Sequence, residues 1–307
     1  MSLLDIQGLS LAFEGTEVVS GLDLRMEPGQ RWALVGESGS GKTVTALSLL
    51  GLAQDAHTSG HAWFESSEGR VDLLNLPTPV LQALRGRDIA MVFQEPMTAL
   101  NPVFTIGEQI SEVLQTKMGM SLKQAHAAAV QLLSDTGIDE PERRAHSYPH
   151  QLSGGQRQRA MIAMALACRP KLLLADEPTT ALDVTVRKQI LDLLGALQTR
   201  YEMAVLLITH DLNLVRQFAD HVAIMQTGVL VEQGPVQTIF SAPQHAYTQK
   251  LLSSAPVRCV VDTNLSAKTS IAVNNLKVSY PIAEKGWRSW FRKNLFVSVE
   301  NASFTLG

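Results

Sequence analysis

Gly36-Glu37-Ser38-Gly39-Ser40-Gly41-Lys42-Thr43 is the stretch of this 307-residue sequence that decides its fold. It fits the phosphate-binding pattern G-x-x-x-x-G-K-[ST], with an apolar run at 31–35 before it and a helical pattern at 44–50 after it. The glycines allow backbone N–H groups to surround a polyphosphate, Lys42 supplies a point charge for its β- and γ-phosphates, and Thr43 offers a hydroxyl to Mg²⁺. The stretch therefore predicts a loop that binds ATP or GTP.

The composition is that of an ordinary globular chain, with 45% hydrophobic residues, 18% charged residues and a formal net charge of −3. This balance gives no basic surplus, so no nucleic-acid partner is expected. We find no apolar run near the roughly 20 residues that span a bilayer, and no signal-peptide pattern. Cys168 and Cys259 are too few for a disulfide framework, a Cys₄ zinc site or an iron–sulfur cluster. The expected location is the cytosol, or a membrane surface reached through partners.

Short apolar runs at 171–175, 204–209 and 221–225 are separated by helical stretches, a pattern typical of a mostly parallel sheet. Residues 105–136 change to a helical period, with Thr105 and Ser121 as candidate N-caps. We therefore predict an α/β P-loop NTPase core with an inserted α-helical subdomain.

A second β region is expected beside the phosphate loop. Residues 4–12 and 18–26 alternate as strands, and residues 61–64 and 71–74 indicate a hairpin. These segments predict an antiparallel β subdomain.

The apolar run 172–175 ends in two acids, Asp176 and Glu177, where an α/β sheet presents its ligand groups. Asp176 is the candidate holder of Mg²⁺, and Glu177 is placed to polarise a water for in-line attack on a γ-phosphoryl group. An acidic strand end is as often a helix cap or a turn. The phosphate loop in the same chain favours the catalytic interpretation.

Ser153, Gly154, Gly155 and Gln156, preceded by Leu152, form a second glycine-containing turn before a helix predicted over 157–167. Its consecutive backbone amides can hold a second anion. The alternative is an N-capped helix with a flexible turn.

These motifs together resemble the ATP-binding cassette (ABC) family. Residues 152–156 resemble its signature motif, residues 180–183, ending in Asp183, its D-loop, and Gln94, Phe13 and His210 its Q-loop glutamine, adenine-stacking aromatic and switch histidine. Singly, such residues are more often a surface glutamine, a core aromatic or a satisfied histidine. Their order and spacing over roughly residues 3–256 carry the resemblance.

The resemblance implies a role for each matched residue. Phe13 would offer a π-face to adenine, and Gln94 would reach both the metal, beside Thr43 and Asp176, and the attacking water. His210 would donate to the γ-phosphate. In the family, ATP lies between two cassettes, so Ser153 to Gln156 and Asp183 would serve a nucleotide shared with a second cassette. The cofactors implied are ATP and Mg²⁺.

The opening pattern of the chain recurs near its end. Residues 6–13 are matched in pattern by 273–280, with Tyr280 in register with Phe13, and 297–306 resemble the second strand. We expect a cassette over 1–256 with its helical insertion at about 95–165, a linker at 257–270, and the truncated start of a second cassette at 271–307. The alternative for this last part is a short accessory β segment. The basic, aromatic residues 287–292 suggest membrane contact or, as we prefer, a solvated or partner-facing loop.

Three further segments resemble the oligopeptide, dipeptide and nickel importer subfamily, including fused two-cassette ATPases that serve microcin C and oligopeptide importers. They are 93–102, 149–151 and 244–252, although Ala246 stands where that pattern has proline. The resemblance implies an ATP-hydrolysing subunit that energises peptide import. It would lie peripherally on the cytoplasmic face of the inner membrane, with two permease subunits, served indirectly by a periplasmic binding protein.

Other interpretations stay open at this point. The same fold could serve nickel or another cargo, belong to a cassette ATPase of DNA repair or translation, or be a non-catalytic cassette. In the transport interpretation, residues 95–104 are the candidate groove for a permease helix.

Overall fold

The computed structural model describes residues 2–95, 99–180, 182–254, 271–282 and 294–306. Two compact units divide the chain, Met1–Ala255 and Pro256–Gly307, called here the first and the second unit. The linker expected at 257–270 and the aromatic segment 287–292 lie outside the described residues. No helix in the described part of the chain combines the length and the apolar character that a membrane crossing requires.

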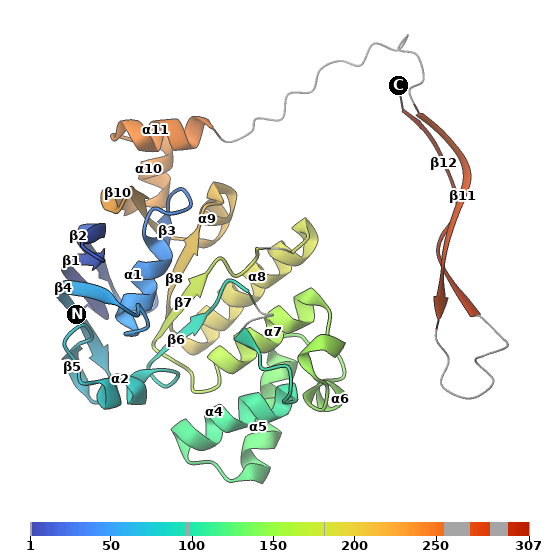
Figure 1. Ribbon diagram of the computed structural model, residues 1–307, viewed down its shortest axis with the longest axis horizontal. Coiled ribbons are helices and arrows are strands. Elements are labelled where there is room, and N and C mark those ends of the chain that lie inside the picture. The colour runs from blue at the N-terminus through green and yellow to red at the C-terminus, as the bar shows by residue number, and fades with distance from the viewer. Residues whose placement is uncertain (1, 96–98, 181, 255–270, 283–293, 307) are drawn as a thin grey trace. The chain divides into compact units, whose positions relative to one another are not determined.

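A mostly parallel sheet forms the centre of the first unit, in the order β10–β9–β3–β8–β7–β6 (Figure 1). All neighbours pair in parallel except β9 and β10, which form an antiparallel hairpin. The four strands β3, β6, β7 and β8 are buried almost throughout, which explains their continuous apolar sequence. The strands are β3 (Arg31–Val35), β6 (Ile89–Val92), β7 (Leu172–Asp176), β8 (Ala204–Thr209), β9 (His221–Gln226) and β10 (Val229–Pro235). The predicted α/β core with a mostly parallel sheet is confirmed.

An antiparallel sheet lies beside the central one, in the order β2–β1–β4–β5. Its strands are β1 (Leu4–Phe13), β2 (Thr16–Met26), β4 (Ala56–Ser66) and β5 (Gly69–Asp72). Helix α1 (Lys42–Leu49) lies between the two sheets (Figure 1). Its Ala46 and Leu49 share one buried cluster with Leu4 of the antiparallel sheet and Leu34 of the central sheet. The helix that follows the phosphate loop is thus held by apolar contacts on both sides.

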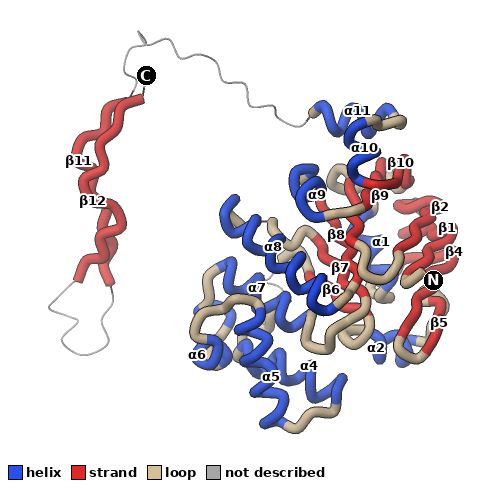
Figure 2. Tube along the Cα trace, turned by 180° about the vertical axis from the view of Figure 1, so that it is seen from behind, coloured by secondary structure: helices blue, strands red, loops and turns tan. Residues whose placement is uncertain are grey.

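Helices cover the central sheet beyond α1 (Figure 2). They are α2 (Thr78–Leu84), α7 (Gly154–Ala165), α8 (Val184–Tyr201), α9 (Leu212–Phe218), α10 (Val236–Ser241) and α11 (Ala246–Ser253). Ile162 of α7 and Leu194 of α8 pack with Leu207 of β8 in a second buried cluster. The core therefore fixes the strands from both faces.

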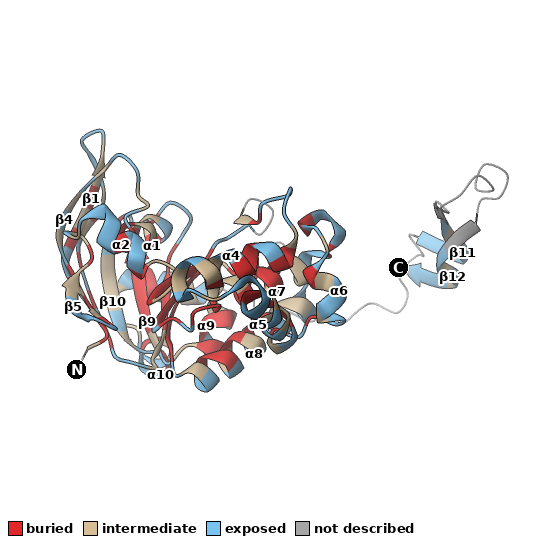
Figure 3. Ribbon diagram, turned by 90° about the horizontal axis from the view of Figure 1, so that it is seen from below, coloured by how far each residue is buried: buried red, intermediate tan, exposed pale blue. Residues whose placement is uncertain are grey.

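The helical subdomain comprises α4 (Ile106–Met118), α5 (Leu122–Asp135), α6 (Pro141–Ala145), a 3₁₀ turn (Pro149–Gln151) and α7. Thr105 and Ser121 form capping boxes at the starts of α4 and α5, as their sequence predicts. Apolar side chains on the facing sides of these helices make a core of their own, and Figure 3 colours the buried residues of these helices red. The subdomain therefore has its own core, and α7 also packs in the second buried cluster with the central sheet.

The second unit is a hairpin of β11 (Ile271–Ile282) and β12 (Asn294–Leu306) whose pairing repeats that of β1 and β2. In the first hairpin, Ile6, Leu9, Leu11 and Phe13 face Leu24, Leu22, Val19 and Thr16. In the second, Val273, Leu276, Val278 and Tyr280 face Phe304, Ala302, Val299 and Phe296.

The irregularities of the two hairpins also coincide. Register shifts follow Ile6, Leu9 and Leu11 in one and the matched Val273, Leu276 and Val278 in the other. Left-handed Gly8 donates its N–H to Asp23 Oδ1 at 2.8 Å, and left-handed Asn275 donates its N–H to Ser303 Oγ at 2.9 Å. Bulges are individual features of a strand pair, so their repetition is stronger evidence of a repeat than the sequence pattern alone.

Candidate functional site

The phosphate loop runs from the end of β3 into α1, and its backbone leaves no room for side chains at two glycines. A Cβ on Gly36 would come within 2.3 Å of the Met225 carbonyl oxygen and 2.6 Å of Ser40 Oγ. Gly41 has a φ of 96°, and its Cβ would lie 2.9 Å from the Val18 carbonyl oxygen. The loop can therefore pack this closely against β9 and β2 only because these positions are glycine.

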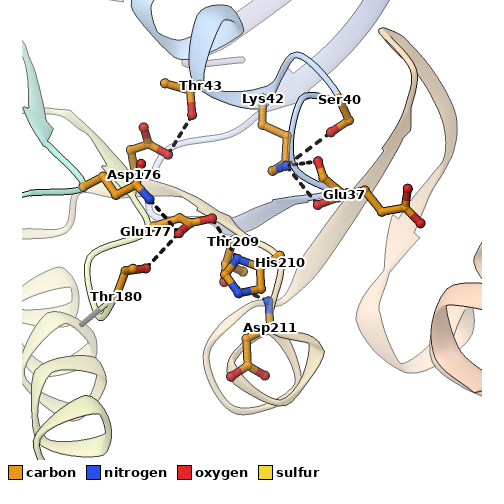
Figure 4. A network of polar contacts seen from close by, with 12 residues as sticks. Glu37, Ser40, Lys42, Thr43, Asp176, Glu177, Thr180, Thr209, His210 and Asp211 are labelled. Atoms are coloured by element: carbon orange, nitrogen blue, oxygen red, sulfur yellow. Dashed lines mark hydrogen bonds and ion pairs between the residues drawn. The ribbon is translucent and has the colours of Figure 1, made fainter. Parts of the chain in front are cut away.

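Lys42 directs its ammonium group back into this loop. Nζ donates to the carbonyl oxygens of Gly36 (2.9 Å) and Glu37 (2.7 Å) and to Ser40 Oγ (3.2 Å), as Figure 4 shows. Burial lowers the pKa of Lys42, against the opposing charges of Glu177 and Asp176. The buried ammonium group of Lys42 and the backbone N–H groups of the loop can together bind a polyanion such as the phosphates of ATP.

Asp176, the last residue of β7, accepts a hydrogen bond from Thr43 Oγ1 at 3.2 Å. The residue is only 2% exposed. Burial raises the pKa of its carboxyl, and the charge of Glu177 adds to this effect, while Thr43 and Lys42 oppose it. A carboxylate and a hydroxyl are oxygen ligands of the kind that Mg²⁺ takes. The pair fits a magnesium ion, whose charge would offset the cost of burying Asp176.

Glu177 is held by three side chains from three parts of the chain. Its carboxylate accepts from Thr180 Oγ1 (2.8 Å) and Gln94 Nε2 (3.1 Å), and Oε1 lies 2.8 Å from His210 Nδ1 (Figure 4 shows Thr180 and His210). Burial acts to raise its pKa, but the hydrogen bonds from His210 and Thr180 and the charges of His210 and Lys42 outweigh burial and hold the pKa below its usual value. The carboxylate is therefore charged and fixed in direction.

The backbone at Glu177 is unusual as well. Its φ is +42°, a left-handed conformation that is uncommon for residues other than glycine, and its N–H donates to the Ile208 carbonyl oxygen at 2.9 Å. Non-glycine residues in this region tend to occur where the surrounding structure imposes them, often at functional sites. This turn directs Glu177 away from the strand that carries Asp176.

Strand register brings these groups together. β3, β8 and β7 are parallel neighbours, with Val35 opposite Thr209 and Asp176 opposite Ile208. The residues that follow each strand therefore emerge at one edge of the sheet. Gly36, Glu177 and His210 are neighbours for this reason, although they are far apart in the sequence.

A hollow of about 370 Å³ opens at this edge. It is lined by residues of β1, β2, the phosphate loop, α1 and the segments that follow β6 and β7, namely Phe13, Val18, Ser38, Gly39, Gly41, Lys42, Thr43, Val44, Gln94 and Glu177. Phe13 is half-buried and places an aromatic ring on the same hollow as the loop. The arrangement suits a ligand with an aromatic ring at one end and a polyphosphate at the other.

The predicted signature and D-loop residues do not line this hollow. Ser153 is the N-cap of α7, with its hydroxyl accepting from the Gln156 N–H, and Asp183 is the N-cap of α8. The helix predicted from residue 157 begins at Gly154 instead, because the capping box of Ser153 and Gln156 draws both glycines into its first turn. The Gln156 N–H is used by this cap, and the N–H groups of Gly154 and Gly155 remain available to an anion.

These two segments lie against each other. A Cβ on Gly154 would be 3.7 Å from Leu182, and one on Gly155 would be 3.0 Å from Val186. The start of α7 and the start of α8 therefore form a separate surface from the phosphate loop in this chain.

Two contacts of the site have no counterpart in the sequence-based prediction. Thr180 donates to Glu177 from three residues further on, a spacing that a search for side-chain donors around Glu177 could have found. Tyr247 accepts from the Glu37 N–H at 3.3 Å. Nothing in the linear sequence connects Tyr247 to a loop 210 residues away.

Comparison with known proteins gives two family matches. Residues 19–180 match the model described as ABC transporter, and residues 231–283 match the oligopeptide/dipeptide transporter, C-terminal region.

Individual relatives and solved structures agree with these matches. A peptidoglycan transport ATP-binding protein of Agrobacterium fabrum is 50% identical over 91% of this chain, and the chain spans 52%, about half, of that relative's length. A putative peptide import ATP-binding protein of Brucella melitensis is 49% identical, over 83% of this chain and 78% of the relative. The ATP-binding cassette MJ0796, solved as a dimer with ADP and Pi, superposes with a TM-score of 0.66 at 28% identity, over 76% of this chain and 98% of that one.

We predict that Asp176→Asn raises the thermal unfolding midpoint of the ligand-free protein near neutral pH. The folded-state pKa of Asp176 is raised, so its contribution favours folding below the unfolded-state pKa of about 3.9 and is lost as pH rises through the folded value. Asparagine keeps an acceptor for Thr43 without the buried charge. Calorimetry across a pH series should show a gain at neutral pH that disappears in acid.

Asp88→Asn is the matched control. Asp88 is 3% exposed, but hydrogen bonds from Arg87 and Ser67 overcome the effect of burial and lower its pKa. Its substitution should lower the midpoint at neutral pH. Equal losses from both substitutions would contradict the assigned electrostatics of Asp176.

Proposed function

Because the chain belongs to the ABC transporter family, as its motifs indicated, we propose that it binds and hydrolyses ATP to drive import of peptides or peptide-like compounds. The observation that carries the proposal is the Glu177 carboxylate, charged and held by Gln94, Thr180 and His210 beside the phosphate loop.

The residues that line the hollow then have separate roles in binding and hydrolysing ATP. Phe13 stacks on the adenine, the loop amides of 36–43 and Lys42 hold the phosphates, and Glu177 accepts the proton of the attacking water. His210 donates to the γ-phosphate, for which it must exchange its contact with Glu177. Thr43, Asp176 and Gln94 would hold a magnesium ion, which would neutralise charge on the phosphates.

We propose that this ATP site is completed by a second cassette. The start of α7 offers the backbone N–H groups of Gly154 and Gly155, but Ser153 to Gln156 and Asp183 lie outside the hollow of their own chain. A facing cassette would bring such a helix start to the phosphates, and MJ0796 is a dimeric cassette. The repeated register of β11 and β12 supports the assignment of 271–307 as the opening hairpin of a second cassette, with 1–256 as the first and 257–270 as the linker.

The permease contact is proposed at the loop before α4. Gln109 is 8% exposed, and its side chain bonds to the backbone of Asn101 and Phe104. This bracing leaves Val103 and Phe104 exposed at 71% and 50%. Rigid, exposed apolar side chains are suited to packing against a helix.

The subunit would lie peripherally at the cytoplasmic face of the inner membrane, bound to two permease subunits. A periplasmic binding protein would deliver the cargo to those permease subunits.

Peptides are the favoured cargo class. The match of residues 231–283 is to an oligopeptide/dipeptide transporter region, and the Brucella relative is named for peptide import. Nickel and non-transport roles have no such support.

We predict that Glu177→Gln slows ATP hydrolysis by about 100- to 10,000-fold, the range for loss of a general base, while ATP still binds. The measurement pairs phosphate release by the assembled transporter with binding of a fluorescent ATP analogue. Glu202→Gln is the control, because Glu202 is also left-handed but lies at the end of α8, away from the site. Unchanged turnover of the assembled Glu177→Gln complex would contradict the assignment.

We predict that replacing both Val103 and Phe104 with alanine lowers transport by at least about tenfold, because loss of an interface anchor costs about 2 kcal/mol or more. ATP binding should be unchanged. Peptide uptake by cells that carry the complete transporter is the measurement. Val80→Ala, at an apolar residue of α2 that is 44% exposed, should leave uptake unchanged. Full uptake with both side chains removed would place the permease elsewhere.

A further inference from the structure

Three side chains with metal-binding atoms meet on the helical subdomain, away from the nucleotide site. They are His126 on α5, Glu142 on α6 and His146 directly after α6. Their ligand atoms all lie within 4.8 Å of one another. The imidazole rings of His126 and His146 have centroids 5.3 Å apart and are inclined by 35°. From this cluster we infer a binding site for Zn²⁺ or a similar divalent metal ion that imidazole binds.

The donor set indicates which cations the cluster prefers. Two imidazole nitrogens and one carboxylate are a known set for Zn²⁺ with a water in the fourth position. Mg²⁺ and Ca²⁺ favour oxygen ligands, so two histidines disfavour them. Among divalent metals, affinity for such nitrogen-containing sites is highest for copper, with zinc and nickel also suited to imidazole. Zinc has no geometric preference of its own and tolerates the open coordination that three protein ligands leave.

Small side-chain movements are enough to close the site. Tetrahedral zinc with bonds of about 2.0–2.1 Å separates its ligand atoms by about 3.3 Å, against the 4.8 Å upper limit here. Glu142 and His146 are exposed and four residues apart, so they lie on one side of the α6 turn and are free to change rotamer. His126 is half-buried and provides the fixed point.

Competing contacts do not occupy the cluster. Within the described residues, none of the three side chains takes part in a hydrogen bond or an ion pair; the nearby Arg143 is paired with Glu140 instead. The cation would therefore replace water rather than protein partners.

A hollow of about 550 Å³ adjoins the two histidines. Ser111, only 3% exposed, lines it, and in the described part of the chain its Oγ has no hydrogen-bond partner. Buried polar atoms usually have a partner, and ordered water often serves where the protein does not. The hollow thus has room for the water that a three-ligand zinc site needs, and its wall carries a hydroxyl without a protein partner in the described residues.

Metal binding would fasten α5 to the corner where α6 meets α4. The Ile106 N–H at the start of α4 donates to the carbonyl oxygen of Ser147, the residue after His146, at 3.0 Å. This corner follows the loop that carries Val103 and Phe104. Occupancy of the cluster would therefore stiffen the base of that loop.

The test is zinc binding by the nucleotide-free protein in magnesium-free buffer, measured by titration calorimetry. We expect one Zn²⁺ per chain, and Co²⁺ in its place should give visible d–d absorption. His126→Ala and His146→Ala should each weaken binding by at least about 100-fold, since loss of even an outer-shell partner costs 10- to 100-fold. Glu142→Gln should weaken it too. His61→Ala, at an exposed histidine beside Asp72, should change nothing.

Three outcomes would overturn the inference: no zinc uptake at micromolar concentrations, uptake unaffected by both His126→Ala and His146→Ala, or several weak equivalents that no single substitution removes. Retained ATP binding shows that each variant is folded. Because the measurement uses neither ATP nor permease, its result is independent of the proposed transport function.

Discussion

The parallel pairing of β7, β8 and β3 is the constraint on which the rest of the site depends. It brings the ends of three strands to one edge of the sheet, with Val35 opposite Thr209 and Asp176 opposite Ile208. Apolar cores on both faces hold this register, because a slip by one residue would exchange the side chains that pack in one core for those that pack in the other. Glu177 then meets His210 through the fold alone, since the two lie in different loops.

The site combines groups that would be unfavourable separately. Asp176 is buried with a raised pKa, Lys42 is buried with a lowered one, and Glu177 has a left-handed backbone. Their opposite charges lie close enough to offset one another in part, and a magnesium ion and a polyphosphate would offset the remainder. Such a balance is expected where a protein keeps charged groups in place for a ligand rather than for stability alone.

Local signals in the sequence predicted much of the fold. The phosphate loop, the apolar strands and the caps at Thr105 and Ser121 depend on neighbouring residues, so short patterns were sufficient. The first turn of α7 was missed because helical glycines look like a loop until the capping box is seen. Tyr247 could not be found at all, because its contact with Glu37 exists only after distant parts of the chain pack together. The matched bulges of the two hairpins likewise appear only in three dimensions.

Hydrogen–deuterium exchange measured by mass spectrometry, with and without a non-hydrolysable ATP analogue and Mg²⁺, tests the central claim most directly. The shared strand edge predicts slower amide exchange in residues 36–43 and in the segments around Glu177 and His210, all on addition of one ligand. Unchanged exchange in 36–43, or protection confined to the helical subdomain, would contradict the nucleotide site described here.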